Sequence, residues 1–399
     1  MAMKKLNTYE NLKKLIGSHY MQGKTAHFFN QKVGWVSSGA PVELLRPFDV
    51  ITLYPENHAS ICGAAKQGSE FCEVAEAEGF SRDLCSYFRC DRGSTLLGTS
   101  PIGGLPRPDF LFGCNNICGT ILKWYEIASR HYDVPFLFVD TPFVHTAITD
   151  HAVEYVTAQL QQAVESLESL TGREFDEQKF VRTLELSKKC VELWTRTLEF
   201  GAYKPSPLTC FDAFTQMAAI VSLRGTQEAV THYMTLNQEL ESRVQKGIAA
   251  VENENIRLLW DNIPVWYAMR GLSELFEKYH ACLVADTYTN AWASAALDTG
   301  NPMESLARNY LEIYLNISMD LMLERIVALI HRFDVDGMVM HSNRSCKPYS
   351  LGQYDLARCI KEETGIPVVI IEADMVDSRV YAEEQMRTRI EAFLESLGE

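Results

Sequence analysis

The sequence predicts an α/β protein in which two doubly wound parallel-sheet domains are separated by a helical segment. Short apolar strands alternate with helical patterns up to residue 150 and again from residue 251, which is typical of parallel βαβ units. Between them, apolar residues recur almost wholly at helical spacing. A chain of 399 residues is long enough for two or three domains. We therefore expect an N-terminal helical segment, a first α/β domain, a helical segment and a second α/β domain, at residues 1–30, 31–150, 151–250 and 251–399.

The N-terminal segment and the first α/β domain begin with a helix. An amphipathic pattern over residues 3–22 predicts this helix, and the first clear strand signal is the apolar, β-branched run at 50–54. Helical patterns follow at 66–79 and 82–92. Two later apolar runs predict the remaining strands of this domain, at 109–112 and 135–140.

The middle of the chain, from about residue 150 to 248, shows helical periodicity. One of its helices is predicted at 177–199. Alternation then resumes, with strands predicted at 256–260, 281–285, 337–340 and 366–371. A last helix, with Met386, Ile390 and Phe393 on one face, closes the chain. In this arrangement a cleft between the two sheets is the natural place for a site.

The composition excludes several classes of function. The net charge is −15 and no long basic block is present, which argues against a nucleic-acid-binding surface. The first residues lack the apolar core of a signal peptide, and no apolar run approaches the ~20 residues of a membrane helix. We therefore expect a cytoplasmic protein that binds neither nucleic acid nor membrane.

Common catalytic motifs are missing from the sequence. We find no phosphate-binding loop of the G-x-x-x-x-G-K-[ST] type, no G-x-G-x-x-G after a strand, no H-E-x-x-H and no G-x-S-x-G. Hydrolysis of ATP, hydride transfer from a dinucleotide and serine hydrolysis therefore have no support in this chain.

The cysteines are the residues that point to chemistry. Their number, 11, is odd, and in a long cytosolic chain a disulfide framework is not expected. Neither the pair Cys85 and Cys90 nor the pair Cys114 and Cys118 has the C-x₂-C spacing of zinc ribbons. Spacing alone leaves metal binding and buried thiols both open. Five others have apolar neighbours and are predicted to be core: Cys72, Cys190, Cys210, Cys282 and Cys359.

Three cysteines lie where helices are predicted to begin. Cys118 and Cys346 directly precede predicted helices, and Cys85 lies in the first turn of one. The helix dipole lowers the pKa of a thiol at this position, and iron–sulfur clusters are held by thiolates. Three such ligands would leave one iron of a [4Fe–4S] cluster without a cysteine, free to bind a substrate oxygen and to pass an electron.

Glu56 lies in the turn after the strand at 50–54. A carboxylate there can cap the following helix or act as a general base. From the residues alone, we favour the cap.

Several motifs together resemble one enzyme family, the (R)-2-hydroxyacyl-CoA dehydratases, which are relatives of ATP-dependent benzoyl-CoA reductase. The motifs are LYPEN at 53–57, DLCSY at 83–87, CNNIC at 114–118, KWYE at 123–126 and NRSC at 343–346. The likeness extends through residues 206–207, 224–226 and 371–374, so it covers nearly the whole chain.

This resemblance implies a heterodimer with a second, homologous dehydratase subunit, each subunit holding a [4Fe–4S] cluster on three cysteines. Carried over by motif, the ligands are Cys85, Cys118 and Cys346. A separate ATP-dependent iron–sulfur activator would inject one electron into a 2-hydroxyacyl-CoA, whose ketyl radical expels the hydroxyl and then loses a proton to give the enoyl-CoA. Ser38 aligns with a serine beside the open iron, and Glu56 with an acid/base carboxylate, which replaces the cap interpretation.

Three alternatives within the resemblance remain. A double-cubane reductase would use the extra Cys62, Cys90 and Cys114, although such relatives carry a cysteine where this chain has Ser38. A benzoyl-CoA-reductase-type subunit would lack the stretch at 55–57. An electron-relay subunit would hold a cluster that never meets substrate. The sequence does not indicate the acyl group.

Overall fold

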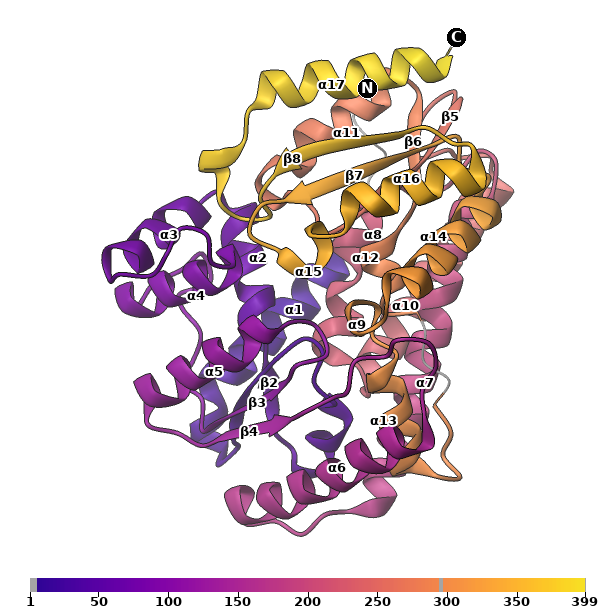
Figure 1. Cartoon of the computed structure of the whole chain (residues 1–399). Coiled ribbons are helices and arrows are strands. Elements are labelled where there is room, and N and C mark those ends of the chain that lie inside the picture. The colour runs from indigo at the N-terminus through magenta and orange to yellow at the C-terminus, as the bar shows by residue number, and fades with distance from the viewer. Residues whose placement is uncertain (1–5, 294–296, 399) are drawn as a thin grey trace.

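Two four-stranded sheets, all of whose strands are parallel, form the frame of the molecule (Figure 1). The computed structural model describes residues 6–293 and 297–398. The first sheet has the order β2-β1-β3-β4 and contains β1 (Val33–Val36), β2 (Ile51–Leu53), β3 (Phe110–Cys114) and β4 (Phe136–Val139). The second has the order β6-β5-β7-β8 and contains β5 (Ile256–Asp261), β6 (Ala281–Asp286), β7 (Gly337–Asn343) and β8 (Val368–Ala373).

These sheets confirm the predicted α/β class, with two parallel sheets separated by helices. The central strands β1, β3, β5 and β7 are almost entirely buried. Near-continuous apolar runs are what a parallel strand covered on both faces requires. This is why the sequence signal for β3 is a short block of apolar residues without polar alternation.

One central strand, β1, precedes the first strand signal found in the sequence, at 50–54. It pairs with β2 on one side and with β3 on the other. It is only four residues long and contains Gly34, where a Cβ would come within 3.0 Å of the Phe110 ring. A short strand with a glycine that makes room for its neighbour gives little β signal in the sequence.

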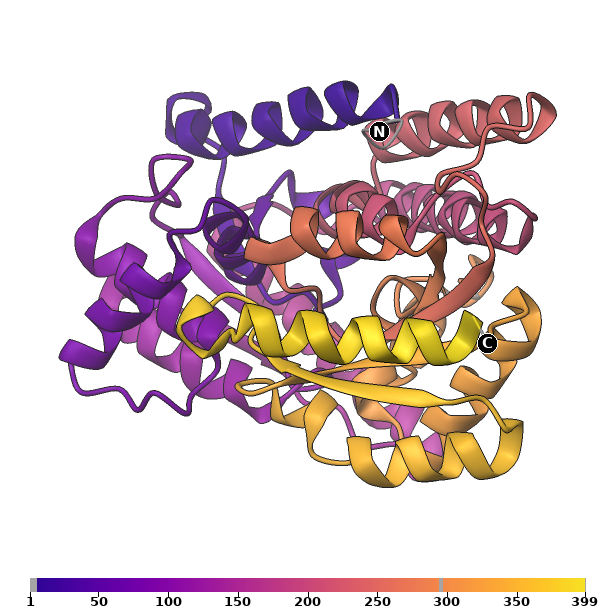
Figure 2. The ribbon, with the colours of Figure 1, turned by 90° about the horizontal axis from the view of Figure 1, so that it is seen from above.

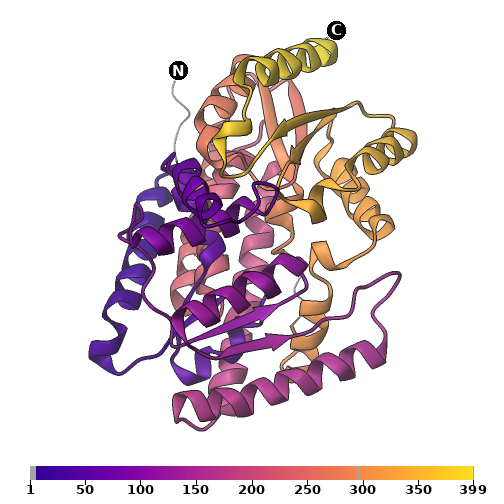
Figure 3. The ribbon, with the colours of Figure 1, turned by 60° about the vertical axis from the view of Figure 1, so that its left-hand side comes forward.

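In the described part of its first half, the chain also contains five α-helices that pack on the sheet or beside it. They are α1 (Thr8–Thr25), α2 (Pro55–Ala64), α3 (Gly68–Ala77), α4 (Ser86–Leu97) and α5 (Gly119–Tyr132). Residues 3–5 of the predicted first helix lie outside the described residues. The predicted helix at 82–92 begins only at Ser86. Figure 3 shows α5 above the strands of the first sheet, with α6 below them.

The helical segment between the sheets agrees with its periodicity. It contains α6 (Asp150–Thr171), α7 (Glu177–Glu199), α8 (Cys210–Gln216), α9 (Ala218–Leu223) and α10 (Gln227–Gln245). The start of α1 meets α10 (Figure 2), where the Glu239 carboxylate accepts hydrogen bonds from the backbone N–H groups of Asn7 and Thr8 at 2.6 and 2.9 Å. The N-terminal helix is therefore capped by a residue from the helical segment.

The second half has longer connections between its strands. Its helices are α11 (Met269–Lys278), α12 (Thr287–Asn290), α13 (Pro302–Leu311), α14 (Met319–Phe333), α15 (Lys347–Ser350), α16 (Gln353–Thr364) and α17 (Glu383–Gly398). Met386, Ile390 and Phe393 of α17 are buried, as predicted. Within the described ranges, no helix has both the length and the apolar character needed to cross a bilayer.

In both sheets the order in which the chain adds strands reverses after the second strand. In each, the chain runs from its first strand to an outer neighbour and returns to the other side of the first strand. Parallel α/β sheets bind ligands at the carboxyl ends of strands beside such a switch point. The switch points lie between β1 and β3 and between β5 and β7.

Candidate functional site

A cavity of about 130 Å³ lies between the two halves. Loops that follow strands of both sheets supply its walls, as the switch points require. Its lining includes Ser38 after β1, Glu56 after β2, Cys118 after β3, Ile263 after β5, Tyr288 after β6 and Cys346 after β7.

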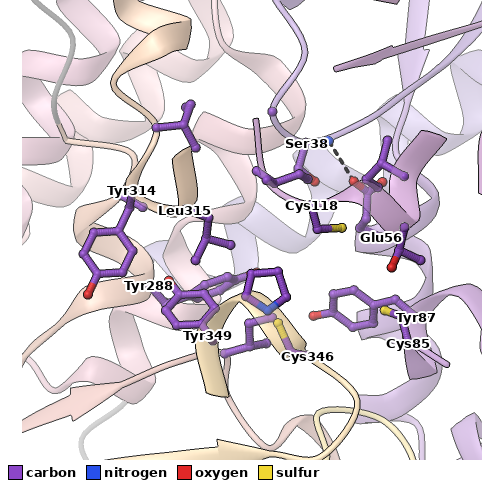
Figure 4. A pocket seen from close by; sticks show the side chains of 18 of the residues that line it. Ser38, Glu56, Cys85, Tyr87, Cys118, Tyr288, Tyr314, Leu315, Cys346 and Tyr349 are labelled. Atoms are coloured by element: carbon purple, nitrogen blue, oxygen red, sulfur yellow. Dashed lines mark hydrogen bonds between the residues drawn. The ribbon is translucent and has the colours of Figure 1, made fainter. Parts of the chain in front are cut away.

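Cys85, Cys118 and Cys346 all line this cavity. In Figure 4 their sulfur atoms are directed towards the same open space. Each is the N-cap residue of a helix, of α4, α5 and α15 respectively. Sequence reasoning placed Cys85 inside a first turn, but the helix begins one residue later, so all three thiols occupy the same position relative to a helix dipole.

A hydrogen bond joins the loops of Cys85 and Cys346, which are far apart in sequence. The N–H of Ser86 donates to Oγ of Ser345 at 3.0 Å. The Ser345 hydroxyl in turn donates to Asp374, which follows β8. Because Ser86 and Ser345 each adjoin a cysteine, this chain of contacts fixes the two cysteine loops relative to each other.

The Cys118 loop is anchored by a buried asparagine. The Asn116 side chain donates hydrogen bonds to the carbonyl groups of Gly39 and Tyr310, both at 2.9 Å. Gly39 belongs to the loop after β1 and Tyr310 to α13 of the second half. The loop therefore contacts both halves of the molecule.

The thiols of the three cysteines lie in a water-poor environment. Burial raises the pKa of Cys85 to about 12 and the pKa of Cys346 well above its ordinary value, and for Cys346 the nearby Cys85 and Cys118 add to the effect. Burial also raises the pKa of Cys118. Metal ligation requires thiolates, so a metal group bound here must displace three protons.

The donor set suits a cluster better than a single ion. Within residues 6–293 and 297–398, no three His, Cys, Asp or Glu side chains are close enough to bind one metal ion. In a cubane cluster each thiolate binds a different iron, so the ligands stand around a space instead of meeting at a point. Three thiols distributed around one cavity have this arrangement.

Glu56 and Ser38 lie together on the same cavity wall. The N–H of Ser38 donates to Oε1 of Glu56 at 2.9 Å, and the Tyr125 hydroxyl donates to Oε2 at 3.2 Å (Figure 4 shows the first bond). The N-cap of its helix is Tyr54, and the Glu56 carboxylate, two residues further on, also accepts a hydrogen bond from its own backbone N–H. Burial raises the pKa of Glu56 to about 7, despite these hydrogen bonds. A carboxyl group with such a pKa can both give and take a proton at neutral pH.

The extra cysteines considered for a second cubane lie elsewhere. In the described part of the chain, none of Cys62, Cys90 and Cys114 lines the cavity. Cys62 and Cys90 interact with each other, and Sγ of Cys62 is 3.8 Å from Nε2 of His58. Cys114 contacts the Thr141 hydroxyl at 3.7 Å.

Of the five cysteines predicted to be core, four are fully buried and one is not. Those buried are Cys72, Cys190, Cys210 and Cys282. The prediction was wrong for Cys359, which is partly exposed on α16. Its helix packs on α14 at the edge of the second half.

Sequence reasoning missed the aromatic wall of the cavity. It consists of four side chains from the second half, with Leu315 beside them: Tyr288, Trp292, Tyr314 and Tyr349 (Figure 4 labels all of these but Trp292). They come from three separate segments, so no periodic pattern connects them. The one available signal was the position of Tyr288, three residues after the predicted strand at 281–285.

Comparisons with known proteins show which family the chain belongs to. A family model described as 2-hydroxyglutaryl-CoA dehydratase, D-component, matches residues 37–397. The chain is similar to the (R)-2-hydroxyisocaproyl-CoA dehydratase alpha subunit of Clostridioides difficile, with 34% identity over 388 residues, 96% of this chain and 95% of the relative.

Two further relatives are similar over most of their length. The (R)-phenyllactyl-CoA dehydratase alpha subunit of Clostridium sporogenes is 35% identical over 367 residues, 92% of this chain and 89% of the relative. The lactoyl-CoA dehydratase subunit alpha of Anaerotignum propionicum is 34% identical over 400 residues, 95% of each chain.

Proposed function

The chain belongs to the 2-hydroxyglutaryl-CoA dehydratase D-component family, and from this premise we propose that it is the iron–sulfur subunit of an (R)-2-hydroxyacyl-CoA dehydratase. The reaction eliminates water from a 2-hydroxyacyl-CoA through a ketyl radical and gives a 2-enoyl-CoA. The observation that supports this most is the presence of three N-cap cysteines and a buried carboxyl group on one cavity.

Cys85, Cys118 and Cys346 would hold a [4Fe–4S] cluster. Their thiol chemistry, their separate helix N-termini and their common cavity fit such a group. When bound, the cluster would supply an iron without a cysteine ligand as a Lewis acid, together with a path for one electron. The N–H groups at the start of each helix stabilise the thiolate charge.

Side chains of the protein would transfer the protons of the reaction. Glu56, within the cavity and hydrogen-bonded to Ser38 and Tyr125, is positioned to protonate the hydroxyl that leaves from C2 and to accept a proton. The apolar walls exclude water, which strengthens these interactions. Ser38 would hold the Glu56 carboxyl group through its N–H and present its hydroxyl group to the substrate.

The relatives are named as alpha subunits, which supports a partner subunit for this chain as well. We propose a heterodimer with a homologous dehydratase subunit, reduced by an ATP-dependent iron–sulfur activator. Every cysteine in the structure has a free thiol, which is consistent with a reducing, cytoplasmic location.

Iron and sulfide counting after anaerobic purification tests the cluster. We expect Cys85→Ser, Cys118→Ser and Cys346→Ser each to lose most of the iron, because serine is a poor ligand for the cluster. Cys359→Ser is the matched control, since Cys359 is also partly exposed but lies away from the cavity. Unchanged iron content in all three variants would contradict the ligand assignment.

Turnover tests the reaction itself. The anaerobic heterodimer, supplied with activator, ATP and a reductant, should convert a 2-hydroxyacyl-CoA to the enoyl-CoA. Addition of the substrate to the isolated chain should also change the electronic spectrum of its cluster. A spectrum that does not change when substrate is added would instead indicate an electron-relay subunit.

A further inference from the structure

The two walls of the cavity differ in chemistry although they occupy corresponding places in the two sheets. After the first strand of each half comes Ser38 in one and Ile263 in the other. After the second strand comes Glu56 in one and Tyr288 in the other. At these two positions the first half presents polar groups, whereas the second half presents an aliphatic and an aromatic side chain. We call the part of the lining around Ser38 and Glu56 the polar wall, although the first half also contributes apolar side chains elsewhere: Ile117, Ile121 and Trp124.

The apolar wall extends well beyond these two positions. Trp292 follows α12, and Tyr314 and Leu315 belong to the short 3-10 helix Tyr314–Asn316. The ring of Tyr314 packs against that of Tyr349, with centroids 5.7 Å apart. In Figure 4 Leu315 points into the space opposite Ser38 and Cys118.

The hydroxyl group of Tyr288 is occupied by protein contacts. It is hydrogen-bonded to the Tyr87 hydroxyl, which also accepts a bond from Nε1 of Trp266 at 2.6 Å. Tyr288 therefore offers a ligand mainly its ring face. Such a surface binds alkyl and aryl groups by exclusion of water and ring contact.

Among the described residues that line the cavity there is no lysine, arginine or histidine. One guanidinium group, that of Arg224, lies behind the wall, 5.2 Å from the centre of the Trp292 ring. It is already paired with the buried carboxylate of Glu43 at 2.7 Å. A carboxylate in the cavity would thus lack a free cation and would share the space with Glu56.

We infer, on the basis of the proposed function, that the site takes 2-hydroxyacyl-CoA substrates with an uncharged, apolar acyl chain and rejects those whose chain ends in a carboxylate. The reacting carbons face the polar wall, with Ser38 and Glu56, and the chain lies against Tyr288, Trp292 and Leu315. An anion buried without a partner is strongly disfavoured, whereas each buried methylene group adds affinity.

Two substrates of similar length test this directly. With the reconstituted heterodimer, we expect kcat/KM for 2-hydroxyisocaproyl-CoA to exceed that for 2-hydroxyglutaryl-CoA by at least about 100-fold. Comparable values for the two substrates would overturn the inference. If the enzyme dehydrates neither substrate, the proposed function is overturned instead. A measurement of substrate-analogue binding then decides the inference.

That binding measurement does not depend on turnover. Isocaproyl-CoA and glutaryl-CoA lack the 2-hydroxyl group and share the CoA moiety, so a difference in Kd reports on the acyl chain. By calorimetry with the cluster-containing heterodimer, we expect isocaproyl-CoA to bind at least about 10-fold more tightly. Equal Kd values would overturn the inference.

A substitution on the apolar wall provides a further test of the inference. Leu315→Arg places a guanidinium group opposite the polar wall, and we expect it to reduce the preference for isocaproyl-CoA by at least about 10-fold. Leu315→Met, which conserves volume and polarity, should leave the preference unchanged. If Leu315→Arg retains its iron and its affinity for isocaproyl-CoA but does not change the ratio, the chain does not lie against this wall and the assignment is wrong.

Discussion

At the scale of single residues, Glu56 shows how burial and hydrogen bonds compete. Removal from water favours its neutral form, and the hydrogen bonds from Ser38 and Tyr125 favour its charged form. Burial is the larger effect, so the pKa comes to about 7. The position in the first turn of α2, next to a cavity, makes this carboxyl group available for proton transfer.

Glu56→Gln should abolish most of the dehydratase activity. The amide keeps the size of the side chain and can still accept the bond from Ser38, but it cannot exchange a proton, so we expect a loss of at least about 100-fold in kcat. Iron and sulfide content should stay unchanged. Glu10→Gln, at an exposed first-turn position of α1, is the control. Full activity in Glu56→Gln would eliminate the acid/base role.

Residues of the site differ in how far they could be predicted. Cys85, Cys118 and Cys346 could be singled out because they lie at helix starts and in specific motifs. The aromatic wall could not, because Tyr288, Tyr314 and Tyr349 meet only through the packing of separate segments. Long-range packing of this kind leaves no local pattern.

At the scale of elements, the helix pair α3 and α4 determines where Cys85 lies. The two helices approach so closely at Gly93 that a Cβ there would lie 1.9 Å from the carbonyl oxygen of Phe71. Neither backbone can yield without a shift of the whole helix. Because Cys85 is the N-cap of α4, its position depends on this contact.

Gly93→Ala should therefore damage both stability and cluster content. We expect a loss of about 1–3 kcal/mol in stability from overpacking, with a lower iron content because α4 moves. Gly17→Ala, in the middle of α1 with nothing within 4 Å of the new Cβ, should be neutral or stabilising. Thermal unfolding and iron counting measure the two effects. A Gly93→Ala protein as stable and as rich in iron as the control would refute the dependence.

The bounds of helices and strands show which elements can be predicted from a local stretch of sequence. Residues 177–199 were predicted as a helix and form α7 with the same bounds, because a long amphipathic pattern dominates its neighbourhood. The strand β1 was missed because one of its four residues is Gly34, which weakens the β signal of so short a run. It is a strand through its pairing with β2 and β3, and pairing partners distant in sequence are not visible in a local window.

At the scale of the whole molecule, a network of charges ties the two halves together beside the site. Arg89 of α4 contacts Asp377, which follows β8, at 2.9 Å. Arg379 bridges Asp377 and Glu76 of α3, both at 2.6 Å. Burial alone would raise the pKa of Asp377, but the hydrogen bonds from Arg379 and Arg89 outweigh it and hold the pKa at about 2.

This network makes the free energy of unfolding depend on pH in the acidic range. Because the folded pKa of Asp377 lies below the unfolded one, its contribution is complete above pH ~4 and is lost as the pH falls towards 2. The contribution is about 2 kcal/mol. Denaturant midpoints should therefore fall more steeply between about pH 4 and pH 2 in the wild type than in Asp377→Asn. Asp355→Asn, at an exposed ion pair, should behave like the wild type. Parallel curves for wild type and Asp377→Asn would contradict the prediction.

The shared strand order of the two halves has a consequence for the number of sulfur ligands. Cys118 and Cys346 follow β3 and β7, the third strand of each half, so they form a matched pair, as duplicated units would supply. Cys85 has no such counterpart, since the segment between β6 and β7 contributes Tyr314 and Leu315 to the cavity instead. A strictly repeated architecture offers donors in even numbers. In the proposed cluster, one iron would thus lack a cysteine ligand because the two halves are not exact repeats. Where a counterpart of Cys85 would be expected, the chain has apolar side chains instead.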